Sequence, residues 1–127
     1  MSITIEVPDA IWLSANQRLH WADKARRTRW VRAMAKSAAL HLPKYSRAVV
    51  TSWVGYPRAG RADPSNAAQL VKAAIDGLVD AGVFPDDDSA HVVDGGYRRD
   101  VKCRPGIHTL RLVIEAINTQ QEGDVCE

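Results

Sequence analysis

The chain has 127 residues, of which 46% are hydrophobic and 25% charged, and its formal net charge is +2. This composition is typical of one globular domain and excludes a low-complexity chain. No run of about 18 apolar residues occurs, which excludes a membrane-spanning helix. The N-terminus lacks a basic segment followed by an apolar stretch, so we expect no signal peptide. Cys103 and Cys126 fit no metal-ligand spacing, and we expect reduced thiols in a cytoplasmic protein.

Charge is distributed unevenly along the chain. Nine Lys or Arg residues and a single acid lie between Arg18 and Arg47, whereas eight Asp residues lie between Asp63 and Asp100. A metal-dependent enzyme that acts on a polyanion would need a basic half beside an acidic half. Two solvated faces of different charge explain the pattern about as well.

The first half of the chain predicts a strand, a helix and a second strand. Ser2 to Val7 alternates with β-branched residues and predicts a strand, and a polar loop follows over 13–20. Trp21 to Leu42 has helical periodicity and is ended by Pro43. Arg47 to Tyr56 is rich in strand formers. The expected apolar stripe of the helix is Trp30 or Val31, Met34, Ala35, Ala38 and Leu42.

The second half predicts one more helix and two strands. The helix runs from about Pro64 to Ala81, with Gly82 as its C-terminal cap. A strand begins at Ala90–Val93 and continues over 97–103 after a break at Gly95-Gly96, and His108 to Ile117 forms the last strand. The order β-α-β-α-β-β predicts an α+β domain over residues 1–118, with a mixed sheet covered by two helices. The polar segment 119–127 is expected to be disordered. The apolar stripe of the second helix is Ala67, Leu70, Val71, Ala74, Ile75 and Leu78.

Acidic residues flank the second helix on both sides. Asp63 precedes Pro64 and suits an N-cap, which by itself explains the Asp-Pro pair. Asp86, Asp87 and Asp88 follow the helix. An 18-residue helix is about 27 Å long, so Asp63 and the triplet can meet only through a loop that folds back or through a second subunit.

The run 61–93, RADPSNAAQLVKAAIDGLVDAGVFPDDDSAHVV, resembles the core of the RusA family of Holliday junction resolvases, many of which come from phages and prophages. The family shows an Asp-x-x-Asn helix start, a helical Lys, Asp-Gly-Leu or Asp-Ala-Leu, Ala-Gly, and a doublet or triplet of Asp. The segment LSANQR is similar to the family's N-terminal loop. The matching positions are Asp63, Asn66, Lys72, Asp76-Gly77-Leu78, Ala81-Gly82 and Asp86-Asp87-Asp88.

The resemblance implies a homodimeric, Mg²⁺-dependent endodeoxyribonuclease that resolves four-way DNA in recombination and repair, in a bacterium or a phage-infected cell. Mn²⁺ would be able to replace Mg²⁺. The implied catalytic residues are Asp63, Asp87, Asp88 and Lys72, and the implied metal ligands are Asp63, Asp86, Asp87 and Asp88. Carboxylates suit this role because Mg²⁺ prefers oxygen ligands and keeps several waters. Lys72 would offset charge on the phosphate, or simply pair with Asp76 on the helix surface.

One position departs from the family pattern, because Ser65 stands where the family has a second acid. We hypothesise that Asp86 or Asp88 supplies the missing ligand. Alternatively, Ser65 or Asn66 binds the ion through water, or the protein binds branched DNA without cutting it.

A basic surface would hold DNA phosphates without reading sequence. His91 lies close to the triplet, although a histidine satisfied within its loop or strand is the more ordinary interpretation. The expected DNA-binding residues are Asn16, Arg18, Lys24, Arg26, Arg27, Arg29, Asn66, Arg98 and Arg99.

Overall fold

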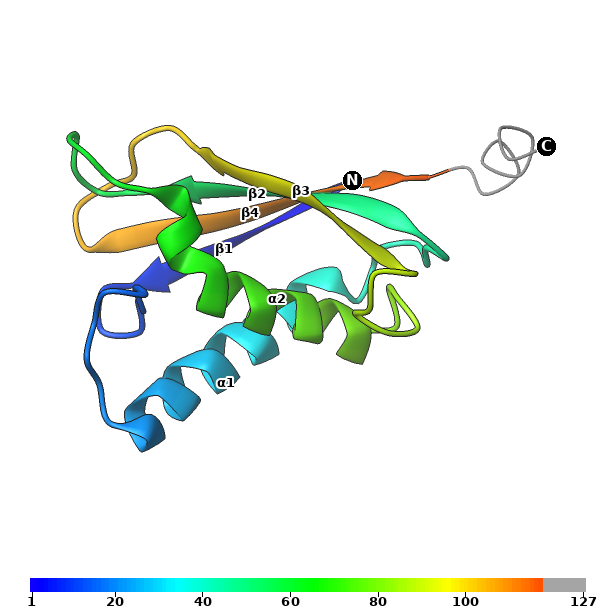
Figure 1. The fold of residues 1–127 in the computed structure, drawn as a ribbon, viewed down its shortest axis with the longest axis horizontal. Helices are drawn as coiled ribbons and strands as arrows, with labels where there is room; N and C mark the ends of the chain where they lie inside the picture. The colour runs from blue at the N-terminus through cyan, green and yellow to red at the C-terminus, as the bar shows by residue number, and fades with distance from the viewer. Residues whose placement is uncertain (118–127) are drawn as a thin grey trace.

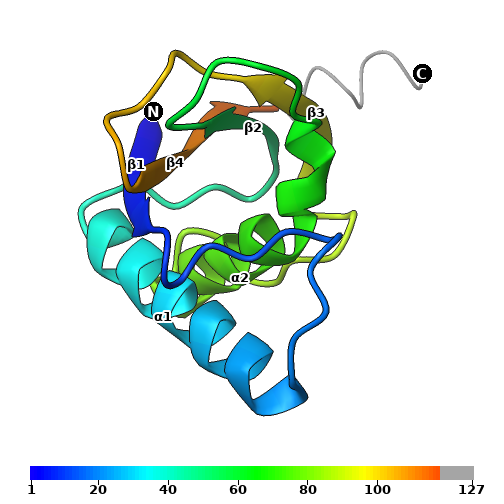
Figure 2. The same cartoon turned by 90° about the vertical axis from the view of Figure 1, so that its left-hand side faces the viewer.

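A computed structural model describes residues 1–117 as one sheet with a helical layer on one of its faces (Figures 1 and 2). The predicted order β-α-β-α-β-β is confirmed, and so is the α+β class with a mixed sheet and two helices. The segment 119–127, predicted to be disordered, lies outside the described residues. The elements are β1 (Ser2–Pro8), α1 (Trp21–Ala39), β2 (Ala48–Gly55), the 3₁₀ turn η1 (Pro64–Ala67), α2 (Ala68–Asp80), β3 (Val92–Arg99) and β4 (Ile107–Ala116).

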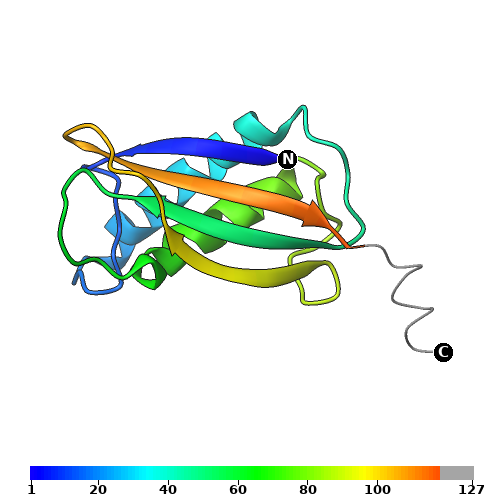
Figure 3. The ribbon, with the colours of Figure 1, turned by 90° about the horizontal axis from the view of Figure 1, so that it is seen from above.

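The sheet has the strand order β1-β4-β2-β3. Strand β4 pairs antiparallel with both β1 and β2, while β2 and β3 are parallel. Parallel neighbours need a crossover connection, and η1 and α2 provide it. Figure 3 shows the open face of the sheet, with both helices behind it.

The core lies between the sheet and the helices. Alternate residues of β1, β2 and β4 face inward, for example Ile3 and Ile5 on β1 and Leu110 and Leu112 on β4, all at most 4% exposed. This is the period-2 pattern of a sheet with one buried face. The open face carries Thr4, Thr51, Trp53, Thr109 and Arg111, which lie between those buried positions.

Helix α1 is shorter than predicted and buries a slightly different stripe. It ends at Ala39 rather than Leu42, and its buried residues are Val31, Ala35 and Ala39. The prediction that Met34 is a core residue was wrong, because this side chain is 43% exposed. The buried residues follow a strict four-residue spacing, and Met34 lies about 100° around the helix from Ala35.

The second helix begins and ends where the sequence predicts. Asp63 is the N-cap and Pro64 the first residue, although the first four residues form a 3₁₀ turn. At the other end, the amide of Gly82 donates to Val79 O at 2.9 Å and that of Val83 to Leu78 O at 3.0 Å. Gly82 has φ +83°. This pair of bonds is the Schellman motif, which confirms the glycine cap.

Strand β3 is continuous, so the predicted break at Gly95-Gly96 was wrong. Val50 pairs with Asp94 and Ser52 with Tyr97, so between these pairs β3 has two residues, Gly95 and Gly96, where β2 has one. This is a β-bulge, and Gly96 permits it with φ +89°. The strand ends at Arg99 rather than at position 103.

No helix within residues 1–117 is long and apolar enough to cross a membrane. This finding agrees with the expectation from the sequence, in which no run of about 18 apolar residues occurs.

Gly77 sits where α2 crosses α1. A Cβ at this position would lie 2.8 Å from the Cβ of Ala35 and 2.9 Å from the amide nitrogen of Lys36, and closer still to the carbonyl oxygen of Arg32. Because two of these atoms belong to the α1 backbone, neither can move aside without displacing the helix. The missing side chain is therefore what lets the two helices approach this closely.

We expect Gly77→Ala to destabilise the protein by about 1–3 kcal/mol, as overpacking does, although alanine alone would favour a helix by about 1 kcal/mol. Urea unfolding measures the change. Ser37→Ala, at an exposed position of α1, is the control and should be close to neutral. A Gly77→Ala protein as stable as the parent would contradict the close crossing.

Candidate functional site

Lys72 joins the acidic loop after α2 to the middle of that helix. Its Nζ donates to Asp76 Oδ1 at 2.7 Å, one turn further along, and to Asp87 Oδ2. The side chain of Lys72 is 60% exposed, and those of Asp76 and Asp87 are just under 30% exposed. One cation thus lies between two carboxylates on the solvent side of α2.

Lys72 and Asp87 hold each other in the charged state. The hydrogen bonds that Lys72 donates to Asp76 and then to Asp87 raise the pKa of Lys72 above its usual value. The hydrogen bond from Lys72 is also the main cause that lowers the pKa of Asp87. At neutral pH Lys72 is therefore an ammonium ion and Asp87 an ionised carboxylate, which is the state that a polar ligand or a cation would meet.

The other two acids of the triplet shape the loop. Asp86 Oδ1 accepts from the amide of Asp87 at 2.7 Å, and Asp88 Oδ1 accepts from the amide of Ala90 at 3.1 Å. His91 Nε2 lies 3.8 Å from Asp88 Oδ1, and its Nδ1 lies 2.9 Å from Ser46 O. His91 therefore has its partners within the fold, as expected for a histidine that is satisfied within its loop or strand. Side chains of all three Asp residues point outside the core.

Asp63 lies at the opposite end of the helix. Its Oδ1 accepts from the amide of Ser65 at 3.0 Å and from Ser65 Oγ at 2.8 Å. The hydroxyl bond and then the amide bond lower the pKa of Asp63. Tyr56 Oη donates to Asp63 O at 3.2 Å and fixes the backbone. Ser65, the departure from the family pattern, thus serves as a second donor to the same carboxylate oxygen.

The acidic residues expected around one ion are separated along the helix. Lys72 is nine residues beyond Asp63, roughly 15 Å along a 3₁₀ turn and the start of an α-helix. Two oxygens bound to one Mg²⁺ lie at most about 4 Å apart, because each bond is about 2.1 Å. Over residues 1–117, no three His, Cys, Asp or Glu side chains are placed to hold an ion together. The loop after α2 folds back along the helix, but its Asp87 reaches only Lys72 and not Asp63.

The donors after α2 nevertheless suit a Mg²⁺ ion that is bound mainly through water. Asp86 and Asp87 are adjacent hard-oxygen ligands on an accessible loop. Magnesium sites often use only one or two carboxylates, with waters and substrate phosphates completing the octahedron. The ligand roles of Asp63, Asp86, Asp87 and Asp88 stay predictions.

The N-terminal loop is brought to the Asp63 end of α2. The amide of Ala15 donates to Asn66 O at 2.9 Å. This bond places the segment with exposed Asn16 and Arg18 next to η1. Asn66 and Asp63 line one open cavity together with Arg61 and Arg99. Sequence-predicted residues from three parts of the chain therefore meet here.

Several predicted DNA contacts on α1 are occupied by intramolecular bonds. Arg26 and Arg27 both pair with Asp23, at 2.7 and 3.1 Å. Arg27 also donates to the carbonyl of Trp12 at 2.5 Å, and its side chain is only 14% exposed. Arg27 thus has a structural role, while Arg29 on the same helix is exposed. Lys24 is partly buried.

The two arginines at the end of β3 point to different surroundings. The guanidinium carbon of Arg98 lies 6.0 Å from the ring centre of Trp53 on the open face of the sheet. Arg99 instead donates to the carbonyls of Arg58, at 3.0 Å, and Gly60. Arg99 therefore fastens the loop between β2 and η1.

Sequence reasoning missed Arg58 and Arg61, which lie in this loop. Both are exposed and line a cavity with Arg99. The signal was the run PRAGRAD, in which two arginines surround Gly60 just before Asp63. Loop residues have no periodicity that would reveal where their side chains point.

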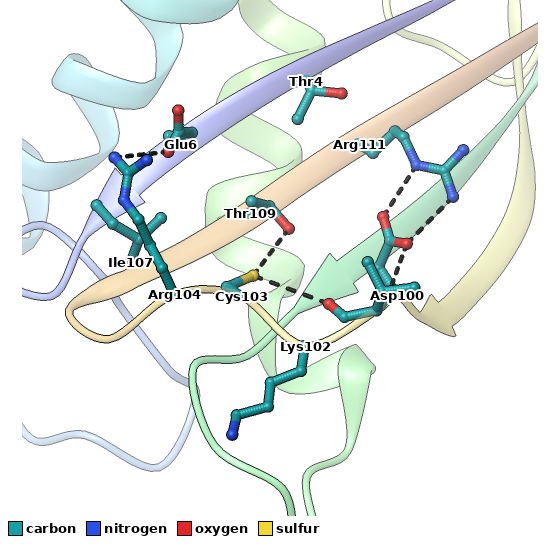
Figure 4. Close-up of a pocket in the computed structure, with 10 residues that line it drawn as sticks. Thr4, Glu6, Asp100, Lys102, Cys103, Arg104, Ile107, Thr109 and Arg111 are labelled. Carbon is teal, nitrogen blue, oxygen red and sulfur yellow. Dashed lines mark hydrogen bonds and ion pairs between the residues drawn. The ribbon is translucent and has the colours of Figure 1, made fainter.

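A further pocket, on the open face of the sheet, has its charges largely paired (Figure 4). Arg111 Nε donates to Asp100 at 2.9 Å, and Arg104 pairs with Glu6 at 2.9 Å. Cys103 Sγ lies 3.4 Å from Thr109 Oγ1. These internal pairs leave little for a charged ligand, so this pocket is a weaker candidate than the two ends of α2.

Comparison of the chain with protein-family models and with curated proteins finds no match.

We expect Asp87→Asn to leave the fold intact, since an exposed ion pair contributes only about 0.2–1 kcal/mol. The folded pKa of Asp87 is lowered, so this contribution is present above about pH 4 and disappears as the pH falls through the lowered value. Urea unfolding at pH 7 and pH 3 measures it, with Asp80→Asn as the control because Asp80 pairs with Arg32 instead. A loss above about 2 kcal/mol would make Asp87 a structural residue.

Proposed function

We propose that the protein is a Mg²⁺-dependent endodeoxyribonuclease of the RusA type, which resolves four-way DNA junctions by paired phosphodiester hydrolysis. The motif order over residues 61–93 and the β-α-β-α-β-β arrangement support the proposal. The observation that carries it is the contact between Lys72 and Asp87, which draws the acidic loop onto the exposed side of α2.

The proposed hydrolysis would use the groups that this contact brings together. Asp86 and Asp87 would hold the ion, which when bound would polarise water and phosphate oxygens. Lys72 stays protonated because its two carboxylate partners raise its pKa. It orients Asp87 and can donate to the charged phosphate as negative charge builds up. Asp76 holds Lys72 from the other side and is a positioning residue.

The DNA would be held by groups that lie outside this cluster. Asn16, Arg18 and Asn66 lie at the Asp63 end of α2, and Arg29 and Arg98 are exposed elsewhere. A four-way junction presents two equivalent strands, which suits a homodimer with two equivalent sites. In such a dimer, Asp63 would either assist its own chain's cluster through DNA and water or act in the partner's site.

A second candidate function is recognition of branched DNA without cleavage. It is favoured by the bonds that tie Asp63 to Ser65. These bonds direct one oxygen of Asp63 toward capping the helix. In that case the acidic loop would be a turn, and the protein would act as a DNA-binding module of the same fold.

The decisive experiment incubates the protein with a synthetic four-way junction and Mg²⁺. We expect paired, symmetrical nicks that disappear with a chelator. Asp87→Asn should reduce cutting by about 100-fold or more, as removal of one electrostatic catalytic group does. Asp80→Asn, a helix acid paired with Arg32, is the matched control and should cut like the parent.

Single substitutions distinguish the roles of the remaining acidic residues. Asp63→Asn, Asp86→Asn and Asp88→Asn, tested in the same assay, identify the carboxylate that replaces the missing acid at Ser65. Normal cutting by all three triplet variants would refute the metal role of the loop. A stable complex without Mg²⁺ and without nicks would instead support the second candidate.

A further inference from the structure

The loop between β2 and η1 encloses a small cavity with three arginines. The cavity has a volume of about 330 Å³ and lies beside the C-terminal ends of β2 and β3. Arg58 and Arg61 come from the loop, and Arg99 is the last residue of β3. Asp9 is the one acid among the residues that line it.

Arg99 gives this loop a defined shape. Its guanidinium donates to the carbonyls of Arg58 and Gly60 and lies 5.2 Å from the ring centre of Tyr56. Tyr56 in turn donates to Asp63 O at 3.2 Å, which fixes the far end of the loop. The loop is thus bonded at its middle and at its end, so the two arginines that it carries are displayed from a fixed backbone.

Arg58 and Arg61 keep their hydrogen-bond donors available. Neither guanidinium makes an ion pair or hydrogen bond within residues 1–117, and both side chains are exposed. Other arginines are occupied by carboxylates, as Arg32 is by Asp80 and Arg111 by Asp100. The acid in the cavity, Asp9, has its Oδ1 3.1 Å from His108 Nδ1, but this nitrogen makes no hydrogen bond and burial lowers the pKa of His108, so the contact is not a fixed ion pair.

The residues that line the cavity would suit a phosphate group. Guanidinium groups present several N–H donors in a planar fork that matches phosphate oxygens. A wider open cavity shares Gly60, Arg61 and Arg99 with the first and extends to Asp63 and Asn66. A polyanion held by the two arginines would therefore continue past Asp63 toward the start of α2.

We propose that the loop 57–62 is a phosphate clamp, in which Arg58 and Arg61 bind the backbone of DNA beside Asp63. This inference rests on the proposed function for the nature of the polyanion, but the phosphate site itself does not depend on cleavage. It gives the Asp63 end of α2 a role in holding the junction about two or three helical turns from Lys72.

The test compares Arg58→Gln/Arg61→Gln with a control that loses the same charge, Lys36→Gln/Lys44→Gln, at two exposed lysines. Binding of a four-way junction is measured against NaCl concentration in the absence of Mg²⁺. We expect the slope of log Kd against log salt to fall by about 2 in the arginine variant, close to one for each lost phosphate contact. The lysine control should keep the slope of the parent.

A second readout does not use DNA. Inorganic pyrophosphate is titrated into the labelled protein, and we expect amide NMR shifts at Gly60 and Ala62 that vanish in the arginine variant. If the protein binds no junction, these shifts still support the phosphate site while the proposed function fails. Shifts without any effect on the salt slope would assign the cavity to a free phosphate compound and overturn the DNA clamp. No shifts and an unchanged slope would overturn the site altogether.

Discussion

The close approach of α1 and α2 at Gly77 is the constraint on which the candidate functional site depends. A Cβ here would meet the backbone of α1, so the two helices pack as one layer against the sheet. Lys72 lies five residues earlier, which places its side chain about 140° around the helix from Gly77. The packing that buries the glycine face therefore turns Lys72 and its acidic partners toward solvent. A rotated α2 would bury them or direct them at α1.

The topology of the sheet explains why the acidic residues separate into two groups. Strands β2 and β3 are parallel, so the chain must travel the full length of the sheet between them. Asp63 precedes the crossover helix and the triplet follows it, so they lie at opposite ends of this helix, which runs along the sheet (Figure 1). Only the return of the loop after α2 toward Lys72 shortens the distance between Asp63 and the triplet. A single chain of this topology can bring the two groups together only through a ligand long enough to touch both.

Periodicity and turn chemistry in the sequence predict most of the fold. Alternation identifies the strands, and the Asp63-Pro64 start and the Gly82 end bound the second helix correctly. The break predicted at Gly95-Gly96 fails because the glycines form a bulge, and only the partner strand β2 reveals that pairing continues. The prediction of Met34 as a core residue fails because the apolar surface of α1 is wider than the stripe that α2 and the sheet cover.

The candidate site is less accessible to such reasoning because it depends on loops. The contact between Lys72 and Asp87 joins residues 15 apart, and the path of the intervening loop decides it. A local pattern does predict the bond from Lys72 to Asp76, one turn away. Arg58 and Arg61 belong to a loop whose shape is set by Arg99, which bonds to residues 39 and 41 positions earlier. The sequence shows that these charges exist, whereas the tertiary fold determines where they gather.

Pairing within the fold decides which basic residues can serve a polyanion. The segment from Arg18 to Arg47 has a large formal excess of positive charge, yet Asp23 engages two of its arginines and Asp80 a third. An arginine already bonded to a carboxylate offers fewer donors and less net charge to a phosphate. Arg58 and Arg61 lie outside the basic segment but keep their charge uncompensated within residues 1–117. For the proposed polyanion-binding surface, unpaired guanidinium groups near Asp63 are therefore a better guide than the density of basic residues along the chain.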